Sequence, residues 1–329
     1  MFVLNEEMKE ELIKKLEQMI MERVDGVESV KVEITDINKI NETRTSVIIR
    51  ENNSTVGPSI YLDSIIGEYD YGIDVDEISE RIFKVYSICT PEKNHIEIMC
   101  VNKDDIFKGC ENRITMQLIN TEQNEMYLKD KPHRESNDLS VIYRIVIEKN
   151  EMGQSSAVVT DSIAKAMKMT EADLFAAGCN YMRTVDTPVI QPLYELVRGM
   201  MGDAVEDISE YDGSFVNDMW ILTNQSKLNG AAAILLDENL QKLTEKMDDD
   251  IYILPSSIHE VVALKAGSVY DEEYLSDMVA MINSTQVKLS ERLSNQVYYY
   301  DRNAHSLTKV GEPARSIDCS QYNPYQQGR

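Results

Sequence analysis

A histidine flanked by hydroxyl and carboxylate side chains lies between two apolar runs near the C-terminal third of the chain. Ser257 precedes His259 by two positions, and Glu260 follows it directly. An imidazole beside a carboxylate and a hydroxyl is a combination that general-base catalysis and metal binding use. The zincin motif is incomplete, because Ala263 stands where its second histidine would be. The simpler interpretation is a turn in which serine hydroxyls satisfy backbone amides and His259 lies at a strand edge.

A Pro-His-Arg run centred on His133 forms a second polar cluster in a connecting segment. If this run meets the first cluster in space, His133 and His259 supply two imidazoles, and Asp138 or Glu260 supplies a carboxylate. Two histidines and one carboxylate suit a divalent transition metal. We therefore treat His133, His259 and Asp138 as candidate metal ligands. Their spacing along the chain does not decide whether they converge on one ion.

The sequence lacks the strong local motifs of nucleotide-dependent and hydrolytic enzymes. It contains no GxxxxGK[ST] phosphate loop, no GxGxxG after a strand, no HExxH and no GxSxG nucleophile elbow. The sequence therefore predicts no cofactor. It also argues against a dinucleotide enzyme, a P-loop ATPase and an ordinary α/β-hydrolase.

The charge balance restricts the classes of partner. The 329 residues include 33 Lys and Arg against 57 Asp and Glu, which gives a net charge of −24. Because nucleic-acid binding needs clustered cations that neutralise phosphates, we expect no direct nucleic-acid partner. The same balance disfavours docking on anionic membrane surfaces. An acidic decoy of a nucleic-acid-binding protein stays an alternative, although the carboxylates are spread over helix starts, turns and the segment 203–212.

Targeting features and cysteine usage indicate a cytoplasmic protein. Residues 1–22 are rich in Glu and lack the basic start and apolar run of a signal peptide. No apolar run approaches the ~18–20 residues that span a bilayer. The five cysteines are scattered and form no CxxC pair, which is typical of a reducing cytosol.

Apolar periodicity predicts a helix, a strand meander and a second helix in an N-terminal domain of residues 1–90. Apolar side chains recur at helical spacing over 5–24, with Asn5 as the expected N-cap. The second helix presents Ile78 and Ile82 on its apolar face. Alternating apolar residues predict three short strands, at 30–34, 46–49 and 60–62.

The remaining pattern predicts a larger α+β domain over 91–310 and a disordered polar tail over 311–329. Thr170 and Asp173 resemble a capping box at the start of one of its helices. Strands joined by short polar turns favour antiparallel pairing. The predicted fold class is α+β, with mixed or mostly antiparallel sheets and helices packed on one face.

Two segments of the larger domain have the same order of features, which indicates a possible internal duplication of a hairpin-plus-helix unit. Residues 143–167 and 219–247 each contain an apolar run, a polar turn with Gly, a second apolar run and a helical pattern. Asp161 and Asp237 stand just before the helical periods and are expected to be N-caps. Two copies are too few for a solenoid.

Three stretches resemble an uncharacterised bacterial family, a domain of unknown function: LINTEQNEMYLKDKPHRESNDLSVIYRI, NGAAAILLDENLQKL and DIYILPSSIHEVVAL. The resemblance extends to about Val310, and ILPSSIHEV is its most specific part. More distantly, residues 138–264 are similar to the YtpQ-type proteins, also of unknown function. The family tends to have an apolar residue and LDL where this chain has Glu135 to Leu139, so that loop departs from the pattern. The resemblance implies a bacterial cytosolic protein and transfers no catalytic residue.

The leading functional hypothesis is a binding or protein-interaction module without its own catalysis, whose partner is another protein. Methionines on helix surfaces could form an adaptable partner groove. These are Met8, Met19, Met21, Met278 and Met281. The alternative is a metal-dependent or hydrolytic enzyme that uses His133, His259 and Glu260, with Ser257 as a further catalytic candidate.

Overall fold

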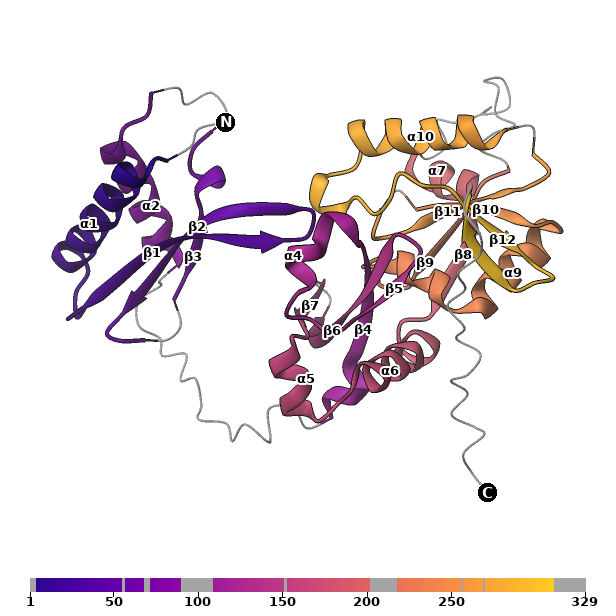
Figure 1. The fold of residues 1–329 in the computed structure, drawn as a ribbon, viewed down its shortest axis with the longest axis horizontal. Helices are drawn as coiled ribbons and strands as arrows, with labels where there is room; N and C mark the ends of the chain where they lie inside the picture. The colour runs from indigo at the N-terminus through magenta and orange to yellow at the C-terminus, as the bar shows by residue number, and fades with distance from the viewer. Residues whose placement is uncertain are drawn as a thin grey trace. The chain divides into compact units, whose positions relative to one another are not determined.

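The computed structural model describes residues 4–54, 57–67, 72–89, 109–150, 153–201, 218–255, 257–268 and 270–310. The chain divides into two compact units, Met1–Val101 and Asn102–Arg329 (Figure 1). The predicted boundary between residues 90 and 91 lies outside the described residues, and so does the predicted tail 311–329.

The described residues of the first unit form two α-helices and a three-stranded antiparallel sheet with the order β1-β2-β3. Its elements are α1 (Glu6–Arg23), β1 (Val30–Lys39), β2 (Glu42–Glu51), β3 (Ser59–Tyr61), the 3-10 helix η1 (Leu62–Ser64) and α2 (Val75–Cys89). Asn5 is the N-cap of α1 as predicted, because its side-chain oxygen accepts the Met8 N–H at 2.8 Å.

The core of the first unit lies between its helices and one face of the sheet. Leu16 of α1, Ile82 of α2 and Ile49 of β2 are all fully buried there. The two helices are also joined at their surface, where Arg23 forms a bidentate ion pair with Glu80. The apolar residues at helical spacing in the helices and at alternate positions in the strands thus form one core between the two layers.

The second unit contains a sheet built around β6 and a six-stranded sheet. Its first elements are η2 (Cys110–Arg113), β4 (Ile114–Asn120), η3 (Glu122–Asn124), α4 (Glu125–Leu128), β5 (His133–Ser136), β6 (Leu139–Asn150), β7 (Gly153–Val158), α5 (Asp161–Met167), α6 (Glu171–Thr184), β8 (Pro188–Pro192) and α7 (Leu193–Met201). The others are β9 (Trp220–Asn224), η5 (Gly230–Leu235), α9 (Asp237–Met247), β10 (Ile251–Leu254), β11 (Val261–Lys265), α10 (Glu272–Thr285), η6 (Leu289–Glu291), β12 (Tyr298–Asp301) and β13 (Ser306–Lys309).

Strand β6 pairs with β4, β5 and β7, and the six-stranded sheet has the order β13-β12-β10-β11-β9-β8. Every strand pair in the described residues is antiparallel. The predicted α+β class with mostly antiparallel sheets is therefore confirmed. The largest core contains side chains from both sheets of this unit, together with α6 and α9.

Helices cover both faces of the six-stranded sheet, whereas the sequence predicts helices on one face. Ile251 and Ile253 of β10 belong to the largest core, which α9 also enters. Tyr252 and Leu254 point to the opposite face and pack in a smaller core under α10. The signal for this arrangement is the unbroken apolar run of β10 and of the first four residues of β11, which is typical of strands buried on both sides.

The two copies of the suspected duplication differ in structure. Residues 143–167 form the hairpin of β6 and β7 followed by α5, as the pattern predicts. In 219–247, however, β9 is followed by the 3-10 helix η5, so the predicted second strand at 231–236 is wrong. The physical reason lies at Gly230, whose backbone packs directly against β9 and the loop after β10. A short apolar run does not by itself distinguish a strand from a buried turn of helix.

The predicted caps of the duplicated unit are displaced by one residue. Asp161 is the first residue of α5, and Thr160 caps it by accepting a backbone N–H. Asp237 is likewise the first residue of α9, which has no side-chain cap bond. The capping box of Thr170 and Asp173 at the start of α6 is confirmed.

Gly230→Ala should lower the free energy of unfolding by about 1–3 kcal/mol, because its Cβ would overpack a rigid site. That atom would lie 2.3 Å from Thr223 Oγ1 and 2.4 Å from the His259 carbonyl oxygen. Gly199→Ala in α7 is the matched control, since a Cβ there meets nothing within 4 Å. Because Ala has a higher helix propensity than Gly, the control should raise the free energy of unfolding by about 0.5–1 kcal/mol. Urea unfolding followed by circular dichroism measures both, and equal effects would contradict the close approach.

Candidate functional site

The loop between β10 and β11 uses its polar groups in contacts with β9 and η5. His259 Nδ1 accepts the Asn229 N–H at 3.3 Å, and its carbonyl oxygen accepts the Thr223 hydroxyl at 2.8 Å. Its own N–H donates to Ser257 Oγ at 3.0 Å. Glu260 is half-buried in the loop, directly before β11. Ser257 and His259 thus satisfy backbone groups and fasten this loop to the neighbouring elements.

Asp138 lies in the turn between β5 and β6 and joins the β6 sheet to the C-terminal strands. Its carboxylate accepts the Ser294 hydroxyl at 2.6 Å and a second hydrogen bond from the Tyr298 hydroxyl. Burial of the phenol, reinforced by the Asp138 carboxylate, raises the pKa of Tyr298 well above its ordinary value. The Asp138 carboxylate therefore accepts two hydrogen bonds from a segment that is more than 150 residues away in the sequence.

His133 lies at the start of β5, where its Nδ1 is 2.8 Å from the Lys131 carbonyl oxygen. Since a carbonyl only accepts, Nδ1 carries the proton in this contact. The strand from His133 to Ser136 is about 10 Å long at ~3.4 Å per residue, so Asp138 lies well away from the imidazole. In the part of the chain that the structure describes, no group of three His, Cys, Asp or Glu could hold a metal ion. The candidate ligand set of His133, His259 and Asp138 is not brought together there.

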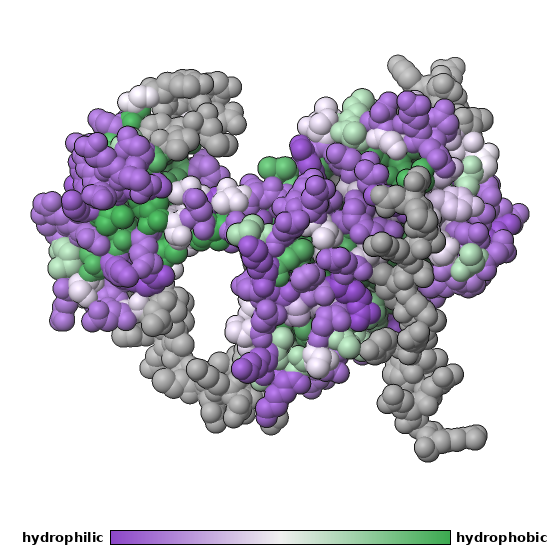
Figure 2. All heavy atoms as spheres, in the orientation of Figure 1, coloured by the Kyte–Doolittle hydropathy of each residue, from purple (hydrophilic) through white to green (hydrophobic). Residues whose placement is uncertain are grey.

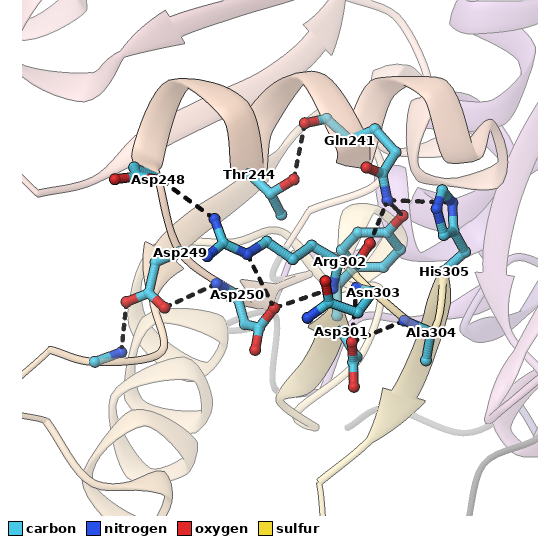
Figure 3. A network of polar contacts seen from close by, with 12 residues as sticks. Gln241, Thr244, Asp248, Asp249, Asp250, Asp301, Arg302, Asn303, Ala304 and His305 are labelled. Carbon is cyan, nitrogen blue, oxygen red and sulfur yellow. Dashed lines mark hydrogen bonds and ion pairs between the residues drawn. The ribbon is translucent and has the colours of Figure 1, made fainter.

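The hairpin of β12 and β13 contains a histidine that sequence reasoning left out. His305 Nδ1 lies 2.7 Å from a carboxylate oxygen of Asp237, whose other oxygen accepts the Tyr300 hydroxyl. Gln241 of α9 donates to the Tyr300 hydroxyl at 2.6 Å and to the Arg302 carbonyl at 3.1 Å (Figure 3). Asp237 and His305 are 68 residues apart, so no local pattern reveals their contact.

The acidic run after α9 also holds this hairpin. Asp249 accepts the Gly267 N–H at 3.0 Å, and Asp250 accepts the Arg302 N–H at 3.0 Å (Figure 3). The Arg302 amide, followed by the Tyr299 hydroxyl, lowers the pKa of Asp250. The carboxylates of this run therefore have a structural role, because they accept backbone N–H groups of a turn and of the hairpin. The other acidic segment, 203–212, lies outside the described residues.

The outer face of α10 presents large apolar side chains to solvent. Tyr274 is 52% exposed and Met281 is 60% exposed. They are seven residues apart, about two helical turns, and so lie on one side of the helix. The Tyr270 ring stacks on Tyr274 with centroids 5.4 Å apart. Met278 between them is half-buried and packs on the core below.

Acidic side chains surround this apolar face. Asp271 caps α10 by accepting the Tyr274 N–H at 2.8 Å, and Glu272, Glu273 and Asp277 follow in the helix. The sequence has no Lys or Arg from 266 to 287. Figure 2 shows light green patches among purple over α10. Among the helix methionines flagged in the sequence, Met19 is buried, and only Met21 and Met281 are strongly exposed.

The comparisons with known proteins give a family and no function. The model of a family of unknown function (DUF5688) matches residues 9–302. The chain belongs to this family. No curated protein and no solved structure matches the chain. The similarity of this DUF5688 member to YtpQ-type proteins stays a prediction.

In the part of the chain that the structure describes, no helix combines the length and the apolar character that a bilayer crossing requires.

Asp138→Asn should lower the free energy of unfolding by about 1–3 kcal/mol, because an amide replaces a carboxylate that accepts two hydrogen bonds from part-buried hydroxyls. Asp130→Asn is the matched control, since the Asp130 side chain is 69% exposed and water screens its ion pair with Lys131. Guanidinium unfolding of both variants measures the difference. A loss no larger than that of the control would contradict the role of Asp138.

Stability should fall as the pH rises above about 10, because several tyrosines ionise less readily in the folded chain. Burial raises the pKa of Tyr143, Tyr298 and Tyr300, and the hydrogen bond to Asp250 raises the pKa of Tyr299 to about 12. The unfolded chain releases these protons first, so their stabilising effect is complete below the ordinary value of 10.0 and is lost above it.

Phenolate absorbance and circular dichroism, recorded together against pH, measure this effect. Tyr299→Phe removes one such group and should make the alkaline loss of stability less steep. Full phenolate ionisation near pH 10 with an intact fold would contradict the account.

Proposed function

We propose that this protein is a protein-binding module without its own catalysis, and that the outer face of α10 receives a basic amphipathic segment of another protein. The observation that carries the proposal is the pair Tyr274 and Met281, exposed on one side of a helix whose charged residues are all acidic. Apolar anchors at this spacing are what a partner helix or peptide contacts when it lies along a helix.

The two side chains differ in what they contribute to such an interface. Tyr274 offers a large ring that is held by its stack on Tyr270, so little conformational entropy is lost on binding. Met281 is flexible and polarisable and adapts to irregular partner surfaces. Together they favour binding of several partners that have similar apolar and charged side chains but different sequences.

Charge selects the kind of partner. The carboxylates of Glu272, Glu273 and Asp277 lie on the same helix as the apolar anchors. A partner with Lys or Arg beside its apolar residues gains attraction and faster association, whereas an acidic partner is repelled. The net charge of −24 extends this preference over longer distances at low salt.

We also infer a bacterial cytosolic location. The five cysteines are scattered along the sequence and form no CxxC pair, which suits a reducing compartment. The family resemblance points to the same setting.

The enzymatic alternative, with His133, His259 and Glu260, has less support. His259 is engaged by Asn229 and Thr223, which gives its loop a structural role. The acidic-decoy alternative also has less support, because Asp249 and Asp250 accept hydrogen bonds from the chain itself, from Gly267 after β11 and from Arg302 in the β12–β13 hairpin.

A fluorescent amphipathic peptide of Leu and Lys, titrated with the protein and followed by anisotropy, tests the proposal. The double variant Tyr274→Ser/Met281→Ser should bind the peptide about tenfold more weakly, because both anchors are truncated. Met126→Ser, which removes a methionine that is 57% exposed on α4, is the matched control and should bind like the unaltered protein.

A peptide of the same composition with its apolar residues scrambled off one face should bind more weakly to the unaltered protein. Since the substituted side chains are exposed, thermal unfolding of the double variant should be unchanged. Failure of the unaltered protein to bind the amphipathic peptide, or equal binding by the double variant and the control, would overturn the proposal.

A further inference from the structure

One face of the sheet around β6 contains a guanidinium that pairs with no carboxylate of the described residues. Arg144 is half-buried in the middle of β6. Its side chain lies on the face away from the largest core, because its neighbours Tyr143 and Ile145 point into that core. Thr115 of β4 is the register partner of Arg144, so the two side chains lie next to each other on this face.

Neutral acceptors from two neighbouring strands hold the guanidinium in place. Its Nε donates to Ser156 Oγ of β7 at 2.9 Å, and its Nη2 donates to the Ser156 carbonyl oxygen at 3.1 Å. Its Nη1 donates to Gln117 Oε1 of β4 at 3.2 Å. A guanidinium has five N–H groups, of which three are used here, so two remain for a ligand. The three bonds orient these remaining donors before a ligand binds.

The positive charge of Arg144 is not balanced by the protein around it. None of the described residues brings a carboxylate into ion-pair contact with this guanidinium. Burial lowers the pKa of Arg144, so the folded chain disfavours its charged form. A partly buried charge without a counter-ion is unfavourable, and an anion that pairs with it stabilises the folded chain. Arg134 on the other face differs, because Glu171 balances its charge at 2.9 Å.

Two hydroxyl groups beside the guanidinium add further donors. One belongs to Thr115, the register partner of Arg144. The other is the Tyr127 phenol of α4, whose pKa is raised by burial and lowered, to a smaller extent, by the nearby charge of Arg144. Neither hydroxyl forms a hydrogen bond with another described residue. One guanidinium and two hydroxyls are therefore available to the same ligand.

We propose that this face of the β6 sheet binds a small organic carboxylate, held by the remaining N–H groups of Arg144 and by the hydroxyls of Thr115 and Tyr127. The planar guanidinium matches the two oxygens of a carboxylate. A single unbalanced cation favours a singly charged group over a phosphate dianion. Lys131, whose ammonium lies 4.0 Å from the centroid of the Tyr127 ring, is already paired with Asp130 at 2.5 Å. The site is independent of the α10 face and of the function proposed for it.

Titration of the full chain with sodium acetate, at neutral pH and constant ionic strength with chloride as the reference anion, tests the proposal. The readout is the Arg144 Nε–H resonance in the proton–nitrogen NMR spectrum, assigned by its loss in Arg144→Lys. The bond to Ser156 slows exchange of this proton with water and so keeps the resonance observable. A saturable shift is expected with acetate. Inorganic phosphate is the second arm, and saturation by phosphate but not by acetate would overturn the choice of a carboxylate.

The double variant Thr115→Val/Tyr127→Phe should weaken acetate binding about tenfold, because two hydrogen bonds to the carboxylate are lost. Tyr127→Phe alone, which leaves β4 unaltered, should weaken it about threefold. Tyr194→Phe on α7, where the side chain is 37% exposed, is the matched control and should bind like the unaltered protein. The proposal is overturned if acetate gives no saturable shift, or if the Tyr127 and Tyr194 variants bind acetate equally.

Discussion

Pairing on β6 is the constraint on which the second unit depends. This strand is the partner of β4 on one side and of both β5 and β7 on the other. Its buried residues Val141 and Tyr143 enter the largest core, which also receives Ile253 and Ala263 from the six-stranded sheet. Because a shift of one residue would turn every side chain of β6 to the other face, its register determines the contacts of both sheets.

The docking surface proposed on α10 follows from this constraint. At the start of β6, Asp138 binds Ser294, whose carbonyl in turn accepts the Asn283 side chain of α10 at 2.9 Å. The inner face of α10 is thereby held, and Tyr274 and Met281 are left on the outer face.

Local pattern explains most of the fold and little of the polar network. Alternation predicts strands β1 to β3, and the Asn5 cap is visible in the sequence because its contact spans three residues. The 3-10 helix that begins at Gly230 was missed, since its cause is a tertiary approach to Thr223. The contact of Asp138 with Tyr298 spans 160 residues, so no local signal encodes it. His133 was selected for its chemistry, but its place at the start of β5 depends on strand pairing that residue types do not reveal.

Native-state hydrogen exchange of the full chain tests the central role of β6 most directly. The amides that pair β6 with β4 and those that pair β10 with β11 should share one opening free energy, to within about 1 kcal/mol, because both sheets depend on one core. Opening of β6 at a clearly lower free energy than β10 and β11 would show that the six-stranded sheet is stable without it, and would contradict this account.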